Sequence, residues 1–322
     1  MGSRDVTFLL IPKFSMIALY GALEPLRVAN RFAGQAFTWR FLSADGQPVT
    51  ASNGIPVSVS GAWGDCGTPD MAVVCASYDH ETGYRRTALA LLRRLARARV
   101  FLAGIDTGAF ILAKAGVLDG YRATCHWESL AGFRESFPAV TTTERLFELD
   151  RDRMTSAGGA AAIDMMLAWI EMGMGRKLAV SVADQLVHFR TQDEQAVARL
   201  PAGARFGTQE PRLLAVIGAM EKNIEEPLGL AALAAQAGLS ARQLERLFHA
   251  EMQQRPMGFY RQLRLEHAEH LLNYSQMSVR DVSLASGFST LAEFSRAFRA
   301  RTGLAPTRFR RRVYPLAKRG AP

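Results

Sequence analysis

Short apolar runs alternate with helical periodicity through the first part of the chain. Four of these runs have the length and composition of buried strands: Val6 to Ile11, Trp39 to Ser43, Met71 to Cys75 and Val100 to Ala103. Two stretches between them repeat their apolar positions with the helical period: Ile17 to Phe32 and Tyr84 to Ala98. The alternation predicts an α/β domain with a mostly parallel sheet sandwiched by helices. Such sheets bind ligands at the carboxyl ends of their strands, so we expect a site directly after a strand.

The pattern changes near residue 190. Residues 191 to 209 are polar and contain Pro201, Gly203 and Gly207, which interrupt any periodicity. Beyond Pro211 every segment has helical periodicity and no strand pattern is found. A chain of 322 residues also exceeds the size at which one core usually stops growing. We therefore expect a ligand-sensing domain over residues 1–190, a linker over 191–211 and an all-α domain over 212–322.

The positive charge of the chain is concentrated in the all-α part. Residues 1 to 211 hold 22 Lys and Arg against 21 Asp and Glu, whereas residues 212 to 322 hold 17 against 9. Clustered basic side chains beside a nearly neutral domain are typical of a module that binds a polyanion such as DNA. A charged, solvated surface without a partner is the alternative that charge alone leaves open.

Cysteine usage and the amino terminus favour a cytoplasmic protein. Cys66, Cys75 and Cys125 are odd in number and lack C-x-x-C spacing, so neither a disulfide framework nor a zinc site is expected. The apolar run from Val6 to Pro12 is too short for a signal peptide. We expect no export, no membrane association, no metal and no cofactor.

A helix-turn-helix pattern begins the all-α part. In the segment from Leu230 to Ser240, Gly238 supplies the turn and Ser240 can cap the following helix. In that helix the apolar stripe faces inward, and Arg242, Gln243 and Arg246 face outward. These three side chains are candidates for contacts in the major groove of DNA.

The same pattern recurs about fifty residues later. Val279 to Ser289 matches the first copy with an offset of 49 up to the turn, and the offset is 50 beyond it. The outward candidates of this second copy are Thr290, Glu293, Arg296 and Arg299. Met257 to Asn273, between the copies, predicts a rod of roughly 25 Å, which could hold two readers about one turn of DNA apart. A helical oligomerisation bundle is the alternative.

The tail resembles the DNA-binding domain of the AraC/XylS family. The resemblance covers about residues 212 to 314 and rests on Gly287-Phe288-Ser289, on Glu293 to Phe298 and on Gly303 to Pro306. It implies that the helices beginning at Ala241 and Thr290 enter successive major grooves of double-stranded DNA. It further implies a transcription activator that meets RNA polymerase.

A sharp turn in the first domain carries an acid. Gly104-Ile105-Asp106-Thr107-Gly108 follows a predicted strand and precedes a helix, as in a nucleophile elbow with Asp106 at an exposed tip. Near a helix N-terminus this aspartate should stay ionised and accessible, suited to a ligand with positive charge. Trp127 could face such a cation through its ring. A structural aspartate that caps the helix is the alternative.

The first domain resembles the PfpI/ThiJ-like fold of the class I glutamine amidotransferase superfamily, a flavodoxin-like fold, as joined to AraC-type tails in GlxA-type regulators. The resemblance rests on the elbow, on Thr124 to Trp127 and on Glu24 in the first helix. In the enzymes the elbow carries a cysteine, with a glutamate and a histidine nearby; the matching positions here are Asp106, Glu24 and His126. Since the thiol is absent, we expect no catalysis.

We therefore expect a binding site, made of Asp106, Thr107, His126, Trp127 and Glu24. GlxA-type regulators with Asp-Thr-Gly at the elbow and a later His-Trp-Glu resemble those that answer to arginine, glycine betaine or carnitine. The expected effector is a small nitrogenous metabolite, such as an amino acid or a quaternary ammonium compound, and the expected assembly is a homodimer. A hydrolase that uses Asp106 and His126 is the alternative.

Overall fold

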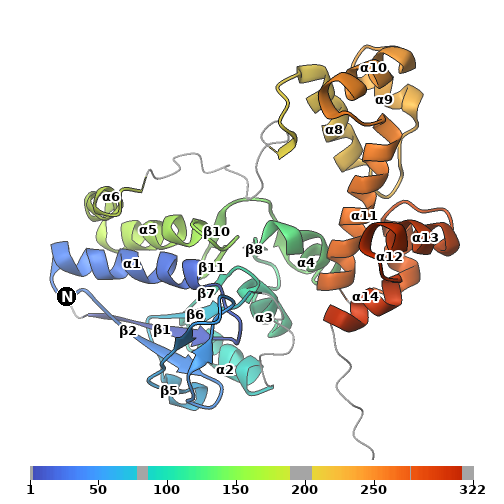
Figure 1. The fold of residues 1–322 in the computed structure, drawn as a ribbon. Coiled ribbons are helices and arrows are strands. Elements are labelled where there is room, and N and C mark those ends of the chain that lie inside the picture. The colour runs from blue at the N-terminus through green and yellow to red at the C-terminus, as the bar shows by residue number, and fades with distance from the viewer. Residues whose placement is uncertain (1–2, 78–85, 189–204, 276, 314–322) are drawn as a thin grey trace, which may run out of the picture. The chain divides into compact units, whose positions relative to one another are not determined.

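The computed structural model describes residues 3–77, 86–188, 205–275 and 277–313, and it divides the chain into two compact units (Figure 1). The first unit is Met1–Ala198 and the second is Arg199–Pro322. Residues 191–204 of the expected linker lie outside the described part of the chain. No helix among the described residues is long and apolar enough to cross a membrane.

The first unit is built on a seven-stranded sheet in the order β10-β11-β7-β6-β1-β2-β5. Every neighbouring pair is parallel except β10 and β11, which are antiparallel. The strands are β1 (Arg4–Leu10), β2 (Phe37–Ser43), β5 (Gly61–Ala62), β6 (Met71–Cys75), β7 (Phe101–Ile105), β10 (Phe147–Asp150) and β11 (Arg153–Ser156). The prediction of a mostly parallel sheet is confirmed, and the four predicted strands correspond to β1, β2, β6 and β7.

Two further strand pairs lie outside the main sheet. β3 (Val49–Thr50) pairs with β4 (Pro56–Val57), and β8 (Arg122–Ala123) pairs with β9 (Thr141–Thr142). Short 3-10 turns follow β5 and β8, at Trp63–Cys66 and at Trp127–Ser129. Thr124 directly follows β8, and His126 lies two residues further along the chain. The position of β8 in the fold therefore determines where these two residues lie.

Helices cover both faces of the sheet. α1 (Met16–Ala33), α5 (Ala161–Met174) and α6 (Arg176–Gln185) pack on one another on one face. α2 (Arg86–Arg97) and α3 (Gly108–Lys114) cover the other, and α4 (Leu130–Ser136) follows β8 (Figure 1). Trp169 of α5 closes the core under the first face, with its ring 5.6 Å from that of Phe37 and 6.5 Å from that of Phe101.

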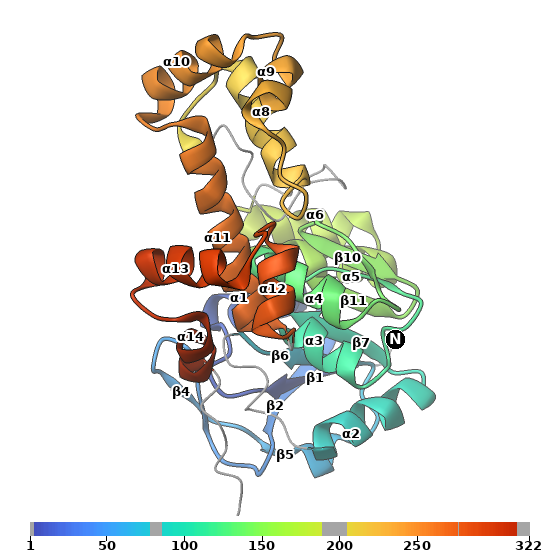
Figure 2. The ribbon, with the colours of Figure 1, turned by 90° about the vertical axis from the view of Figure 1, so that its right-hand side faces the viewer.

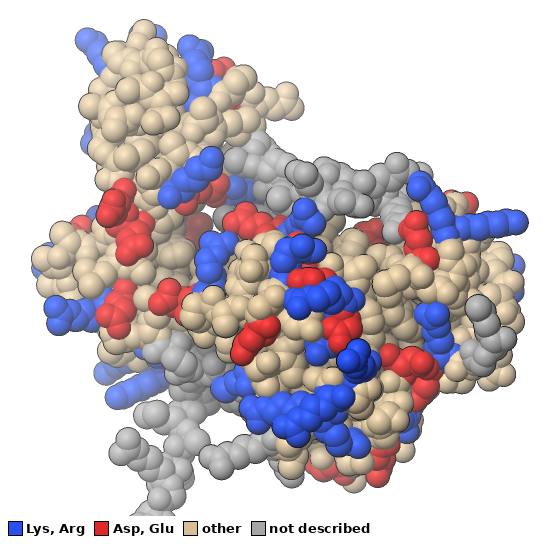
Figure 3. Space-filling model, turned by 180° about the vertical axis from the view of Figure 1, so that it is seen from behind, with Lys and Arg blue, Asp and Glu red and all other residues tan. Residues whose placement is uncertain are grey.

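A basic stripe runs along the surface of the first unit. Arg93, Arg94 and Arg97 are exposed on α2, and the exposed Arg99 follows directly. Lys and Arg side chains gather low on the molecule, where α2 lies in Figure 1 (Figure 3). Residues 1 to 211 nevertheless hold 22 basic against 21 acidic side chains, so acidic side chains elsewhere in this part of the chain balance the positive charge of the stripe. A basic surface alone therefore does not identify a nucleic-acid interface in this protein.

The described residues of the second unit form helices joined by turns and short loops, with no strand among them (Figure 2). The helices are α8 (Pro211–Lys222), α9 (Leu230–Gln236), α10 (Ala241–Met252), α11 (Pro256–Tyr274), α12 (Val279–Ala285), α13 (Leu291–Thr302) and α14 (Pro306–Val313). Leu244 and Phe248 of α10 are fully buried, as are Phe294 and Phe298 of α13. This spacing of four residues places both pairs on the inner face of their helix, as the repeat predicts.

Candidate ligand site and nucleic-acid interface

The elbow predicted after β7 is formed, and steric constraints explain its two glycines. A Cβ on Gly104 would lie 2.9 Å from the backbone nitrogen of Ala109, and a Cβ on Gly108 would overlap the carbonyl oxygen of Val74. Between them Asp106 has a φ of 59°, in the left-handed region that L-residues rarely adopt. Its N–H donates to the carbonyl oxygen of Ser156 at 3.0 Å. The turn is therefore held between the ends of β6 and β11.

Asp106 is buried, which corrects the expectation of an exposed and accessible tip. Only 7% of this residue is accessible to solvent. Ser77, two residues beyond β6, donates its hydroxyl to Oδ2 of Asp106 at 3.1 Å, and Thr107 donates its hydroxyl to the carbonyl oxygen of Ser77. A Cβ on Gly158 would lie 2.9 Å from that of Asp106, so the chain beyond β11 closes over the carboxyl group.

Burial raises the pKa of Asp106 from 3.8 to about 6. The charge of His126 and the hydrogen bonds from Ser77 and from the backbone of Thr107 oppose this rise, whereas the charge of Glu128 adds to it. The groups around Asp106 thus supply too little positive charge to offset the cost of burying its ionised carboxylate. A ligand that brings a positive charge would stabilise the ionised form.

The segment after β8 carries the remaining polar groups of this candidate site. Nδ1 of His126 lies 3.8 Å from Oε2 of Glu128, and the ring of His126 lies 5.7 Å from that of Trp127. Cys125 is fully buried, and its pKa is raised well above the ordinary value by burial and by the negative charge of Asp106. A protonated, buried thiol is a poor nucleophile, so Cys125 does not replace the missing cysteine of the elbow.

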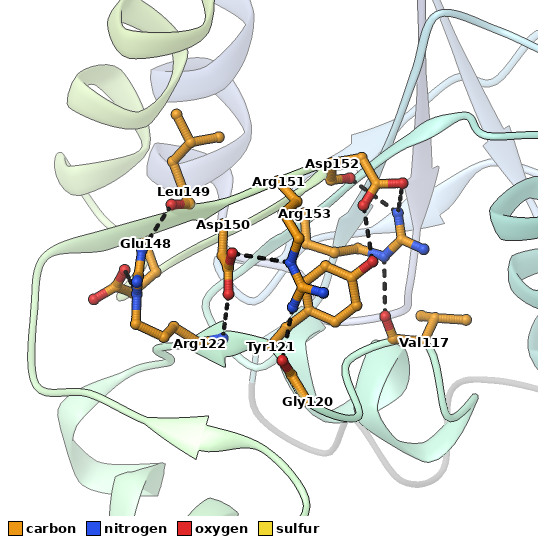
Figure 4. A network of polar contacts seen from close by, with 10 residues as sticks. All are labelled: Val117, Gly120, Tyr121, Arg122, Glu148, Leu149, Asp150, Arg151, Asp152 and Arg153. Atoms are coloured by element: carbon orange, nitrogen blue, oxygen red, sulfur yellow. Dashed lines mark hydrogen bonds and ion pairs between the residues drawn. The ribbon is translucent and has the colours of Figure 1, made fainter.

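A network of arginines and acids anchors this segment to the sheet (Figure 4). The N–H of Arg122 in β8 donates to Oδ2 of Asp150 at 2.8 Å, and its Nε lies 3.3 Å from the buried carboxylate of Glu148. Two residues later, Thr124 donates its N–H to the hydroxyl of Thr155 in β11 at 2.8 Å. These contacts tie the start of the segment to β10 and β11, and so they fix the approach of His126 to the elbow.

The structure gives Glu24 a different partner from the one the resemblance implies. Its carboxylate accepts hydrogen bonds from Nε of Arg27 at 3.1 and 2.8 Å on the partly exposed surface of α1. The acid whose charge reaches Asp106 is Glu128, and the hydroxyl that reaches it belongs to Ser77. The role of Glu24 in ligand binding stays a prediction. Ser77 was not among the predicted site residues, although its place just beyond a predicted strand was a usable signal.

The two outward helix faces of the second unit begin at well-formed caps. The hydroxyl of Ser240 accepts from the N–H of Gln243 at 3.3 Å, and the side chain of Gln243 accepts from the N–H of Ser240 at 2.8 Å. Thr290 caps α13 by accepting from the N–H of Glu293 at 3.2 Å, and Ser289 donates to the Glu293 carboxylate. Three of the predicted DNA-reading residues thus already form caps, which gives them a structural role.

The four arginines among the predicted DNA-reading residues differ from these capping residues. Arg242, Arg246, Arg296 and Arg299 are all exposed on α10 and α13. Among the described residues no carboxylate forms an ion pair with any of them, whereas Arg301 is held by Glu266 and Glu269 of α11. Unpaired guanidinium groups on an exposed helix face are available to phosphates and base edges.

Two side chains of α11 hold the second helix-turn-helix unit and the loop after α8 in place. Arg264 donates from Nη1 to the carbonyl oxygen of Gly287 at 2.7 Å, and its guanidinium lies 4.7 Å from the ring centre of Phe288. One helical turn earlier, Tyr260 donates its hydroxyl to the carbonyl oxygen of Asn223, in the loop after α8. A Cβ on Gly287 would overlap a carbonyl oxygen of that same loop. The turn of the second helix-turn-helix unit is therefore packed against α11 and against the loop that leads into the first unit.

Comparison with protein families identifies both halves of the chain. Residues 5–172 match the family model described as the DJ-1/PfpI family, which covers more than half of the chain. Residues 233–312 match a model described as a helix-turn-helix domain. The second match runs from within α9 to α14 and includes all seven predicted DNA-reading residues.

Relatives with both parts align along nearly the whole chain. The HTH-type transcriptional regulator CdhR of Pseudomonas aeruginosa is 45% identical, covering 98% of this chain and 93% of that protein. The HTH-type transcriptional regulator GlxA of Rhizobium meliloti is 38% identical, covering 96% of each. A crystal structure of an AraC family transcriptional regulator from Pseudomonas putida superposes with a TM-score of 0.54 at 31% identity, over 57% of this chain and 99% of that one.

Proposed function

The chain belongs to the family of HTH-type transcriptional regulators that join a DJ-1/PfpI domain to an AraC-type helix-turn-helix domain, and from this we propose that it is an effector-controlled activator. Its effector is a small nitrogenous metabolite with a positive charge, such as an amino acid or a quaternary ammonium compound. The metabolite binds in the first domain without being transformed, and the second domain binds operator DNA.

The observation that carries the proposal is the buried carboxyl group of Asp106. Burial holds its pKa near 6, because the surrounding groups supply little compensating positive charge. An ammonium or guanidinium group of a ligand would supply that charge, and Trp127, beside His126, offers an aromatic face for a cation. His126, Glu128 and Thr107 would complete the polar lining, and Glu24 would join it only after leaving Arg27.

The effector shifts the chain between two arrangements that differ in how they present the reading helices. It does so only to the extent that it binds one arrangement more tightly than the other. A homodimer formed through the first domain would place four reading helices on a repeated operator, where the protein would recruit RNA polymerase. The mass of the full-length protein in solution, measured by light scattering with and without effector, tests this assembly.

Thermal melting of the full-length protein with amino acids, betaines, carnitine and polyamines tests the effector class. A ligand at a hundred times its dissociation constant adds about 2.7 kcal/mol to the stability of the domain that binds it. We expect an upward shift with a cationic compound, its loss in Asp106→Asn, and its retention in the matched control Asp119→Asn, which changes an exposed loop. Retention of the shift in Asp106→Asn would contradict the proposal. Ester or amide turnover lost in the same variant would instead favour a hydrolase.

A further inference from the structure

The two reading helices of the second domain can be compared position by position. α10 (Ala241–Met252) and α13 (Leu291–Thr302) are both 12 residues long. Each begins after a capping hydroxyl, at Ser240 and at Thr290, and the fully buried side chains of the two helices fall at equivalent positions. Two residues fifty positions apart in the sequence therefore occupy the same place on the outward faces of α10 and α13.

The outward positions of the two helices carry different chemistry. Ala241, Arg242, Glu245, Arg246 and His249 of α10 correspond to Leu291, Ala292, Ser295, Arg296 and Arg299 of α13. The two faces share an arginine in the second turn of the helix. In the first turn, however, α10 presents the guanidinium of Arg242 and α13 presents two apolar side chains.

Leu291 has no evident function in the fold of its own domain. The residue remains 46% exposed at the first position of α13, and Ala292 beside it is also exposed. Its counterpart Ala241 shows that a smaller side chain suffices at this position of a capped helix. A large apolar side chain that the fold leaves in water gains stability only when a partner covers it. On a reading helix, that partner is the floor of the major groove.

We infer that the two helices recognise different base chemistry, and that Leu291 is a specificity-determining residue. α10 reads guanines through Arg242 and Arg246, whereas α13 reads the 5-methyl group of a thymine through Leu291 beside a guanine read by Arg296. The inference rests on the proposed DNA-binding function. In the major groove only thymine presents a methyl group, and guanine presents the paired acceptors that a guanidinium binds in bidentate fashion.

The structure also orders these contacts along the DNA. The contacts of Arg264 and Tyr260 anchor the second helix-turn-helix unit, and the loop that leads into the first, to the same helix α11, so the two elements of the operator have one fixed spacing. Reading helices in successive major grooves lie about one turn of DNA apart. The operator is then asymmetric, with a guanine-based element for α10 and an element containing thymine and guanine for α13.

The test begins with selection of duplexes from a randomised DNA pool by the full-length protein. In the selected site each thymine is then replaced by deoxyuridine, which lacks only the methyl group. We expect one replacement to lower the affinity of the wild-type protein about four-fold, since one buried carbon is lost. The same replacement should leave the affinity of Leu291→Ala unchanged. Leu284→Ala, which removes a leucine 53% exposed on α12, is the matched control and should respond as the wild type does.

The possible outcomes separate this inference from the function on which it rests. Failure to select any sequence would overturn the DNA-binding function itself. A selected site in which no thymine responds to deoxyuridine, or in which Leu291→Ala still responds, would overturn the role of Leu291 alone. The deoxyuridine series with wild-type protein remains decisive even if a variant folds poorly, because it changes only the DNA.

Discussion

Asp106 lies in the turn after a buried strand with 7% of its surface accessible, whereas Arg246 and Arg296 project from helix surfaces without an ion-pair partner among the described residues. The acid depends on three neighbouring strand ends and two obligatory glycines; each arginine depends only on the face of one helix. Substitutions in the first site should therefore change the stability of its domain, and substitutions in the second should change DNA binding with little effect on stability.

Replacing a glycine of the elbow tests the first half of this contrast. In Gly108→Ala the new Cβ overlaps the carbonyl oxygen of Val74, and we expect a loss of about 3 kcal/mol or more in the first domain. Gly238→Ala is the control in the tail: its φ of 63° is strained for alanine, but nothing lies within 4 Å, so about 1 kcal/mol is expected. Calorimetry of the full-length protein measures both, and equal losses would contradict the contrast.

Removing the charge of Asp106 should stabilise the domain above pH 6. A folded-state pKa raised from 3.8 to about 6 means that the stability associated with the protonated form is fully present below pH 3.8 and is lost as the pH rises through 6. That difference corresponds to roughly 3 kcal/mol. Asp106→Asn should therefore melt at a higher temperature than the wild type at pH 7.5, and the advantage should vanish near pH 4. If the difference in melting temperature between Asp106→Asn and the wild type were the same at pH 4 and at pH 7.5, it would contradict the burial of a charged carboxylate at Asp106.

Replacing an exposed arginine of α10 or α13 tests the second half of this contrast, namely that such substitutions change DNA binding and have little effect on stability. Arg246→Ala and Arg296→Ala should each weaken binding to the selected operator by roughly 5- to 150-fold, the equivalent of about 1–3 kcal/mol. The melting temperature should stay close to that of the wild type. Fluorescence anisotropy at fixed salt measures the affinity. Arg94→Ala, on the basic stripe of α2, is the matched control, and an equal loss of affinity there would argue against α10 and α13 as readers.

The smallest change is expected at an arginine that is on a reading helix but already paired. Arg301→Ala removes ion pairs with Glu266 and Glu269, whose N–O distances are 3.2 and 2.6 Å. Partly exposed pairs of this kind contribute about 0.2–1 kcal/mol. We expect a slight loss of thermal stability that diminishes in high salt, and a smaller loss of DNA affinity than in Arg296→Ala. A loss of affinity as large as in Arg296→Ala would show that Arg301 leaves its pairs to bind DNA.

The tail was the more predictable part of the fold because its pattern is local. The repeat fixed the turn at Gly238 and the inward positions Phe248 and Phe298, since a helix face follows from sequence spacing alone. The strand pattern predicted β1, β2, β6 and β7 for the same reason. What local periodicity could not reveal is that Gln243 and Glu293 are used in caps, which depends on the rotamers of the folded helix ends.

The candidate ligand site was only partly predictable because it forms across the sheet. Asp106 and the elbow glycines are one short motif, and the sequence identified them. The burial of Asp106, and its contact with Ser77, come from the placement of β6 and β11 beside β7, which spacing along the chain does not contain. The effect of the Glu128 charge on Asp106 was not predicted for a similar reason, because it depends on where the fold places the segment after β8.

The contacts that Arg264 and Tyr260 make have a practical consequence for protein engineering. All of these groups lie between Pro211 and Val313, so the contacts on which we propose that operator spacing depends are contained in one transferable block. A biosensor built by fusing this block behind a foreign sensor should retain the operator spacing of the parent. A chimera that exchanges one helix-turn-helix unit alone would separate Arg264 from the carbonyl group it holds, and it would need a newly matched interface before its two halves could read DNA in phase.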